Sequence, residues 1–244
     1  MKSLLFGLIQ GLTEFLPISS SGHLNILNRL VPIDASIFSY IILLHLATLC
    51  AVLVFFWKKI IILLSQRTFL LRLFFITLIT GVIGLLIKHF LKENMEHKYV
   101  VTICLLINAI ILFTAKMAAG KRTVTNLSWR DCTLLGFVQG IAVLPGISRS
   151  GITIVTALRR GFIAQEAFDI SFIMSIPAIL GAFLLEAREI RSMPISGIQI
   201  AIGSISAFIV GLITLFIVRK VLIAKKFQLF GYYCLFLSIV SIVL

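Results

Sequence analysis

The chain has 244 residues, of which 60% are hydrophobic and only 13% are charged. Soluble domains carry about a quarter of charged residues, so this composition excludes a soluble globular protein and predicts an all-α integral membrane protein. The net charge of +13 would indicate nucleic acid as the partner of a soluble chain. In a membrane chain it predicts basic loops that fix orientation, with contact to anionic lipids as a secondary effect and no nucleic-acid partner.

The first apolar stretch, residues 4–30, is interrupted in its middle by Pro17, Gly22 and a run of serines. The part before the break is about a dozen residues long, which is too short to cross about 30 Å of hydrocarbon as a helix. We therefore expect a re-entrant helical hairpin that enters and leaves the membrane on one side. Gln10 and Glu14 interrupt the apolar stretch after Lys2, which makes it a poor signal peptide.

The rest of the chain supplies six uninterrupted apolar stretches and a second broken one. The broken stretch covers residues 131–158 and is interrupted by Pro145, Gly146 and two serines, so it predicts a second re-entrant hairpin. The cysteines are widely spaced without a CxxC pair, which predicts neither a disulfide framework nor a zinc site. We expect six transmembrane helices at about 36–57, 69–91, 98–116, 166–186, 197–218 and 227–244.

The two broken stretches align without a gap at an offset of 129 residues, from Gly7 on Gly136 to Gly22 on Gly151. Seven of these sixteen positions are identical, and the predicted spans follow the same offset. The sequence therefore predicts a first repeat over 1–116, a cytoplasmic linker over 117–130 and a second repeat over 131–244. Three crossings per repeat place the second copy upside down, which is the inverted-topology plan in which interrupted segments mark the binding site.

Basic residues at the loops and span ends then choose the orientation. The side of the N-terminus has seven of them and the opposite side has fourteen, which leaves only Arg149 at a hairpin tip. Because cytoplasmic loops carry the excess of Lys and Arg, we expect both termini and the mouth of the first hairpin on the outer face. A homodimer is compatible with the sequence.

The hairpin tips hold the polar residues from which a site could be built. Glu14 and Arg149 stand out because charged groups inside a membrane are costly and are functional by default. The alternative is a buried ion pair that only pins the hairpins together, but this leaves the tip hydroxyls unexplained. Arg binds two phosphate oxygens with its planar fork, and the start of a helix attracts anions. The phosphate-binding candidates are Ser19, Ser21, Ser148, Arg149, Ser150 and Thr153.

An acidic group beside an anion site needs a reason, and two are available. Glu14 either ligates a divalent cation, together with Gln10 four residues earlier on the same helix face, or acts as a general base. Ser20 is a candidate nucleophile or phosphate donor, and His23 a candidate nucleophile, base or leaving-group acid. For His45, in the middle of a span, packing is the favoured interpretation.

At these residues the chain resembles the bacterial undecaprenyl-diphosphate phosphatases, also called the bacitracin-resistance protein family. The resemblance covers essentially the whole chain and rests on two signatures, Gln10 to His23 and Pro145 to Gly151. It implies release of the terminal phosphate of undecaprenyl diphosphate in the bacterial inner membrane, which regenerates the carrier lipid for wall polymers. It also implies Mg²⁺ or Ca²⁺ as cofactor and an inverted repeat with re-entrant helices.

The same resemblance places the essential acid on Glu14, the essential serine on Ser20 and the essential arginine on Arg149, with His23, Ser148 and Thr153 also in the site. The first acid of the family motif is Gln10 here, which keeps an oxygen ligand but loses the charge. The alternative function is a flippase for the polyprenyl phosphate, because an inverted repeat with a midplane site also suits a transporter.

Overall fold

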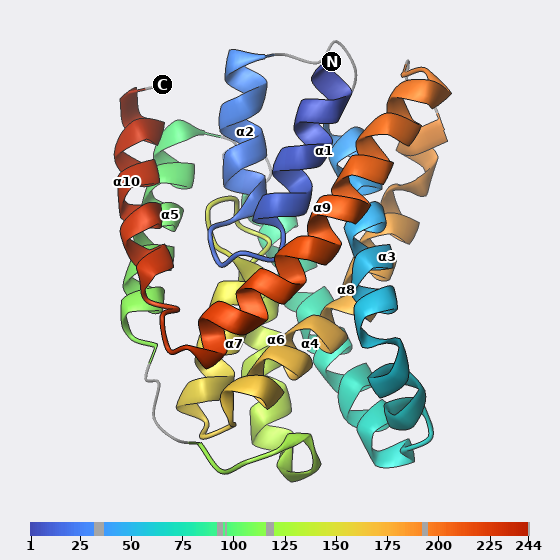
Figure 1. Ribbon diagram of the computed structural model, residues 1–244, viewed down its shortest axis with the longest axis vertical. Helices are drawn as coiled ribbons and strands as arrows, with labels where there is room; N and C mark the ends of the chain where they lie inside the picture. The colour runs from blue at the N-terminus through green and yellow to red at the C-terminus, as the bar shows by residue number, and fades with distance from the viewer. Residues whose placement is uncertain (32–36, 92–94, 96, 116–119, 192–194, 244) are drawn as a thin grey trace.

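The computed structural model describes residues 1–31, 37–91, 95, 97–115, 120–191 and 195–243, with the side chains of 37–39 and 186–191 left out (Figure 1). Regular structure in these residues is helical, apart from one isolated bridge between Arg122 and Phe162 and a short 3₁₀ turn at Val124–Asn126. The all-α class is thereby confirmed. The helices are α1 (Lys2–Thr13), α2 (Ser20–Leu30), α3 (Ile37–Leu64), α4 (Arg67–Leu91), α5 (Lys98–Phe113), α6 (Trp129–Ile141), α7 (Arg149–Arg159), α8 (Ala164–Arg191), α9 (Gly197–Ile223) and α10 (Leu229–Val243).

Four helices, α3, α4, α8 and α9, are long and apolar enough to cross a membrane. They make the chain a multi-pass membrane protein, as its composition predicts. The other two predicted spans form α5 and α10, with 16 and 15 residues. At 1.5 Å per residue these two apolar helices are only about 22–24 Å long, so the count of six crossings stays a prediction.

Both broken stretches fold as pairs of short helices. The first gives α1 and α2 with 12 and 11 residues, and the second gives α6 and α7 with 13 and 11 residues. Ser19 and Ser148 cap the second helix of each pair, because their side chains accept hydrogen bonds from the N–H groups of Gly22 and Gly151. Ser19 and Gly22 recur as Ser148 and Gly151 in the repeat, so part of the repeated motif is a capping signal.

Close helix contacts explain two more of the repeated glycines. The helix α1 packs against α9, and α6 packs against α4. A Cβ atom at Gly7 would lie 2.2 Å from the carbonyl oxygen of Gly203, and one at Gly136 would lie 2.8 Å from that of Ile76. A side chain at either position would push two helices apart, so glycine is needed for the approach of backbone to backbone.

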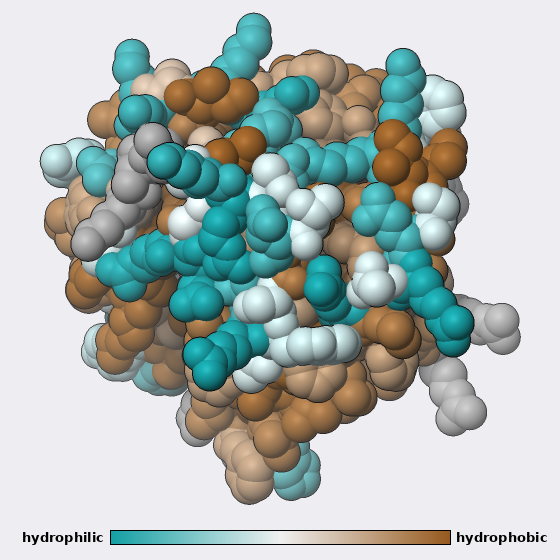
Figure 2. All heavy atoms as spheres, turned by 90° about the horizontal axis from the view of Figure 1, so that it is seen from below, coloured by the Kyte–Doolittle hydropathy of each residue, from teal (hydrophilic) through white to brown (hydrophobic). Residues whose placement is uncertain are grey.

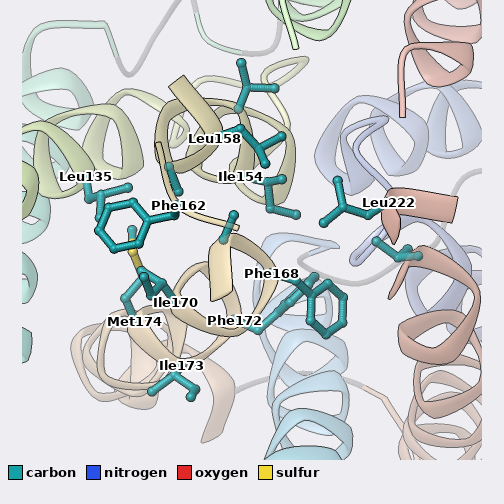
Figure 3. Packing of buried hydrophobic residues seen from close by; sticks show 14 of the residues in the cluster. Leu135, Ile154, Leu158, Phe162, Phe168, Ile170, Phe172, Ile173, Met174 and Leu222 are labelled. Atoms are coloured by element: carbon teal, nitrogen blue, oxygen red, sulfur yellow. The ribbon is translucent and has the colours of Figure 1, made fainter. Parts of the chain in front are cut away.

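The largest hydrophobic cluster lies where α3, α7, α8 and α9 meet below the hairpin tips. Its centre is aromatic: Phe168 and Phe172 are fully buried, and their ring centroids lie 4.7 Å apart. Figure 3 shows these rings beside Ile154 and Met174. Other phenylalanines, such as Phe74 and Phe90, have two thirds or more of their surface exposed. Both predicted uses of phenylalanine, core packing and an apolar outer surface, are therefore found.

Candidate functional site

The two hairpin tips, residues 14–19 between α1 and α2 and residues 142–148 between α6 and α7, contact each other near the middle of the molecule (Figure 1). The backbone N–H of Gly146 donates to the Ser19 hydroxyl oxygen at 3.1 Å, and the Ser150 hydroxyl donates to the Leu16 carbonyl at 3.4 Å. Ser19 has φ +67°, a left-handed conformation that favours glycine. Strain of this kind gathers at functional sites, where the surrounding contacts hold it in place.

A buried asparagine in α5 braces both tips. The Asn108 side-chain amide donates to the Pro17 carbonyl of the first tip at 2.9 Å. Its oxygen accepts from the Ser148 N–H of the second tip at 3.0 Å. One fully buried side chain therefore sets how the tips face each other. The sequence analysis did not single it out, although a lone amide in an apolar span is the kind of residue that marks a function.

The Glu14 carboxylate lies at the centre of the polar contacts between the tips and is 93% buried. Its Oε1 accepts a hydrogen bond from the Arg149 guanidinium. Its Oε2 accepts from the Ser20 hydroxyl at 2.7 Å and from the Gln10 amide at 3.0 Å. The structure thus brings together the four residues that the sequence predicts for metal binding and chemistry, apart from His23. A carboxylate with donors on both oxygens is held ionised, ready to accept a proton.

The neighbour that the sequence analysis assigned to packing is His45 of α3. Its Nε2 lies 3.2 Å from Glu14 Oε2, and its Nδ1 lies 2.8 Å from the Ile41 carbonyl oxygen. The interpretation of His45 as a packing residue is therefore wrong. Periodicity does not report a contact between residues 31 positions apart, and the signal available was the position of a histidine in the middle of a span.

His23, in contrast, points away from this cluster. Its Nδ1 lies 2.7 Å from the Ser19 carbonyl oxygen, and its Nε2 lies 2.8 Å from the hydroxyl of Tyr233 in α10. The two rings stack at 5.6 Å with only 3° between their planes. Both ring nitrogens are thus engaged outside the Glu14 cluster, and the predicted catalytic role of His23 has no contact with Ser20 or Glu14 behind it.

The predicted phosphate-binding hydroxyls fall into two groups. Ser19, Ser148, Ser150 and Thr153 are at least 97% buried. Their hydroxyls make hydrogen bonds within the protein, as in the 2.6 Å contact between the hydroxyls of Thr153 and Ser171. Ser20, Ser21 and Arg149 are only half-buried and lie at the starts of α2 and α7. An anion can reach this second group, whereas the first group builds the tips.

The residues that could hold a metal ion are Gln10 and Glu14. Within the described residues there is no group of three or more His, Cys, Asp or Glu side chains placed to hold one. However, the Gln10 Oε1 atom is buried without a hydrogen-bond partner, beside a carboxylate. An unpaired buried oxygen is costly, and oxygen ligands are those that Mg²⁺ and Ca²⁺ prefer. The donor set therefore fits a hard divalent cation that takes its remaining ligands from substrate and water.

Comparison with known proteins places the whole chain in one family. Residues 3–240 match the family model described as bacitracin resistance protein BacA. The chain is 38% identical to an undecaprenyl-diphosphatase of Thermosipho africanus, covering 99% of this chain and 98% of that protein. It is 35% identical to one of Methanococcus vannielii and 36% identical to one of a Thermotoga species, with 98% of each chain covered in both cases. The chain therefore belongs to the bacitracin resistance protein BacA family, as its two tip motifs predict.

Proposed function

We propose that this chain hydrolyses undecaprenyl diphosphate to undecaprenyl phosphate and inorganic phosphate, recycles the carrier lipid for cell-wall synthesis and confers bacitracin resistance. Membership of the family and the activity named for its relatives support this reaction. The observation that carries it to particular residues is the 2.7 Å hydrogen bond from the Ser20 hydroxyl to Glu14, with Arg149 on the other carboxylate oxygen.

In the proposed reaction the Ser20 oxygen attacks the terminal phosphorus while Glu14 accepts the hydroxyl proton. The bond from that phosphorus to the bridging oxygen breaks, and undecaprenyl phosphate leaves. Water then hydrolyses the phosphoserine, releases inorganic phosphate and restores the Ser20 hydroxyl. The Arg149 guanidinium and the start of α2 stabilise the charge on the transferred phosphoryl group.

The divalent cation is part of this proposal. Glu14 and the unpartnered Gln10 oxygen would hold Mg²⁺ or Ca²⁺ at the buried side of the phosphate site. A bound cation would neutralise diphosphate charge beside a carboxylate that otherwise repels it. Because Gln10 is neutral, we expect weaker cation binding than two carboxylates would give.

A pocket of about 470 Å³ supports a lipid substrate. It lies between α1, α2 and α10 and is apolar except for Thr13, His23 and Tyr233, and His23 is one helical turn from Ser20. Pockets of 300–1,000 Å³ hold ligands of drug size, and a chain of 55 carbons is larger. We therefore propose that the pocket holds the first isoprene units and that the rest of the tail stays in the bilayer.

The proposed membrane arrangement is the inverted repeat with two re-entrant hairpins and six crossings. Shifted by 129 residues, the range 20–30 becomes 149–159, which are the bounds of α7. The helix contacts are reciprocal in the same way, because α1 of the first repeat packs on α9 of the second, and α6 of the second packs on α4 of the first. The ends of α5 and α10 complete the symmetry, since these equivalent helices pack on each other.

The proposed orientation has both termini outside. Figure 1 places N and C at one end of the molecule, and Figure 2 shows the opposite end covered by hydrophilic residues. The connections at that end carry exposed basic residues such as Lys58, Arg130 and Lys225. A basic end of this kind faces the cytoplasm, which leaves the outer end for the mouth beside α1 and α2.

The experiment is phosphate release by the purified protein in detergent from undecaprenyl diphosphate, with and without Mg²⁺ or Ca²⁺. We expect metal-dependent release, its loss in Ser20→Ala, and acid-stable ³²P on wild-type protein quenched during turnover of terminally labelled substrate. Ser21→Ala is the matched control, because Ser21 does not contact Glu14 in the described structure. Absence of phosphate release under every metal condition, with movement of labelled lipid phosphate across vesicles instead, would favour the flippase.

A further inference from the structure

The orientation of the His45 ring is fixed by its own helix. Its Nδ1 lies 2.8 Å from the Ile41 carbonyl oxygen one turn earlier in α3, which directs Nε2 at Glu14 Oε2, 3.2 Å away. A neutral imidazole has one donor nitrogen and one acceptor nitrogen. Here each nitrogen faces an oxygen acceptor, so the arrangement is attractive only when both nitrogens carry hydrogen and Nε2 donates to the carboxylate.

His45 binds the same carboxylate oxygen as the proposed nucleophile. Glu14 Oε2 receives Ser20, Gln10 and His45, whereas Oε1 receives Arg149. The Glu14 side chain is only 4% exposed, so these contacts, rather than water, determine which way its oxygens point. The direction of Oε2 matters because it is the oxygen that takes the Ser20 proton.

The two halves of the chain provide an internal comparison. At the offset of 129 residues Gln10 corresponds to Gln139, Glu14 to Val143 and His45 to Met174. The glutamine is kept, while the acid and the histidine are both replaced by apolar residues. In the second half the Gln139 amide donates instead to the Thr80 hydroxyl and the Met174 carbonyl. The histidine is thus present in the half that has the carboxylate, as expected if it serves Glu14.

A diphosphate arriving at the tips competes with Glu14 for Arg149, because a guanidinium binds phosphate oxygens through the same fork. When Arg149 turns to the phosphate, Oε1 loses its donor and the carboxylate can rotate. His45 and Gln10 are the donors on Glu14 outside the reacting groups, and His45 comes from a different helix. We propose that His45 is a positioning residue that holds Glu14 Oε2 toward Ser20 while Arg149 binds substrate, an inference that rests on the proposed function.

The test is steady-state kinetics of His45→Leu in the phosphate-release assay. Loss of a residue that orients a reacting group costs 10–100-fold in activity. We expect kcat to fall by about this factor while KM stays within about twofold, because the Arg149 contact with substrate is untouched. His45→Gln places an amide donor at a similar reach and should recover most of kcat. His45→Asn has the same amide on a shorter side chain and should not.

Thr48→Val is the matched control, because Thr48 is a buried polar residue of the same helix whose hydroxyl bonds only to the Leu44 and His45 carbonyls. We expect wild-type kcat for this variant. A kcat within twofold of wild type for His45→Leu, equal activity of the Gln and Asn variants, or an equal loss in Thr48→Val would each overturn the positioning role. If the Leu variant does not fold, the Gln and Asn pair decides alone. An inactive wild-type protein would instead reject the proposed function.

Discussion

The Arg149 guanidinium reaches from the start of α7 to Glu14 at the end of α1, so one ion pair joins the two hairpin tips across 135 positions of the chain. Both side chains are largely buried, with 17% of the Arg149 side chain and 4% of the Glu14 side chain exposed. A buried pair of this kind is weak evidence for stability, because desolvation offsets the attraction. Its value lies in holding ready an arginine that a phosphate can take.

We expect Arg149→Ala to lower kcat/KM by about 10³-fold or more, because an arginine that stabilises a phosphoryl transition state has an effect of 10³–10⁵. Arg149→Lys keeps the charge but loses the fork, so it should recover only part of the activity. The measurement is phosphate release from undecaprenyl diphosphate. Arg130→Ala, which removes an exposed arginine at the start of α6, is the control and should behave as wild type. Wild-type activity of Arg149→Ala would show that the pair only pins the tips.

The Asn108 brace predicts a loss of both stability and turnover. In Asn108→Leu the Pro17 carbonyl and the Ser148 N–H lose their partner, and each unsatisfied buried group costs about 1–3 kcal/mol. We expect a lower Tm in detergent and a lower kcat, because the tips that bear Glu14 and Arg149 are no longer held in register.

The control for Asn108 is Thr102→Val in the same helix, which breaks a buried hydrogen bond to Ser241 of α10 without touching either tip. It should lower Tm while leaving kcat near that of wild type. Equal effects of the two substitutions on kcat would contradict a specific brace.

The apolar pocket predicts a change in chain-length preference. Leu12 lines the pocket and is 45% exposed, so Leu12→Trp should fill space without disturbing the core. We expect KM for undecaprenyl diphosphate to rise about tenfold, which corresponds to about 1.4 kcal/mol of lost tail contact. A diphosphate whose chain is too short to enter the pocket should be hydrolysed equally by both proteins. Leu4→Trp, on an exposed part of the same helix outside the pocket lining, is the control.

Hydropathy and its interruptions predicted the helices and the tips, because apolar length and Pro-Gly-Ser breaks are local properties. Glu14, Ser20 and Arg149 could be found because a charge or a serine run within apolar sequence has few structural explanations. The repeat misled in one respect, since Ser19 and Ser148 recur as helix caps and Thr153 bonds to Ser171, so these hydroxyls build the tips.

His45, Asn108 and Tyr233 could not be assigned from the sequence because their partners lie on other helices. The contact between His23 and Tyr233 joins residues 210 positions apart. Whether a polar residue in a span faces a site, a neighbour or lipid depends on how the helix is rotated in the bundle. Helix α3 is apolar around most of its circumference, so its own sequence does not define that rotation.

The last prediction concerns Asp131, a fully buried carboxylate in the first turn of α6 at the basic end of the molecule. Burial raises the pKa of Asp131, but hydrogen bonds from Arg122 at 2.5 Å, Ser128 at 2.6 Å and Arg160 at 2.6 Å outweigh it and hold that pKa well below its usual range. A carboxyl group with a depressed folded-state pKa stabilises the fold above its unfolded pKa, near 3.9, and this stabilisation is lost as the pH falls toward the folded value.

Asp131→Asn should therefore lower stability at pH 7 by about 1–3 kcal/mol, the usual effect of removing hydrogen bonds to a charged group. The gap in Tm between wild type and variant should be constant from pH 7 to about pH 5 and should narrow below about pH 4, as the wild-type protein loses what the variant already lacks. Thermal unfolding in detergent across this range measures it. A gap that does not narrow in acid would mean that Asp131 stabilises the start of α6 through its shape and capping bonds rather than through its charge.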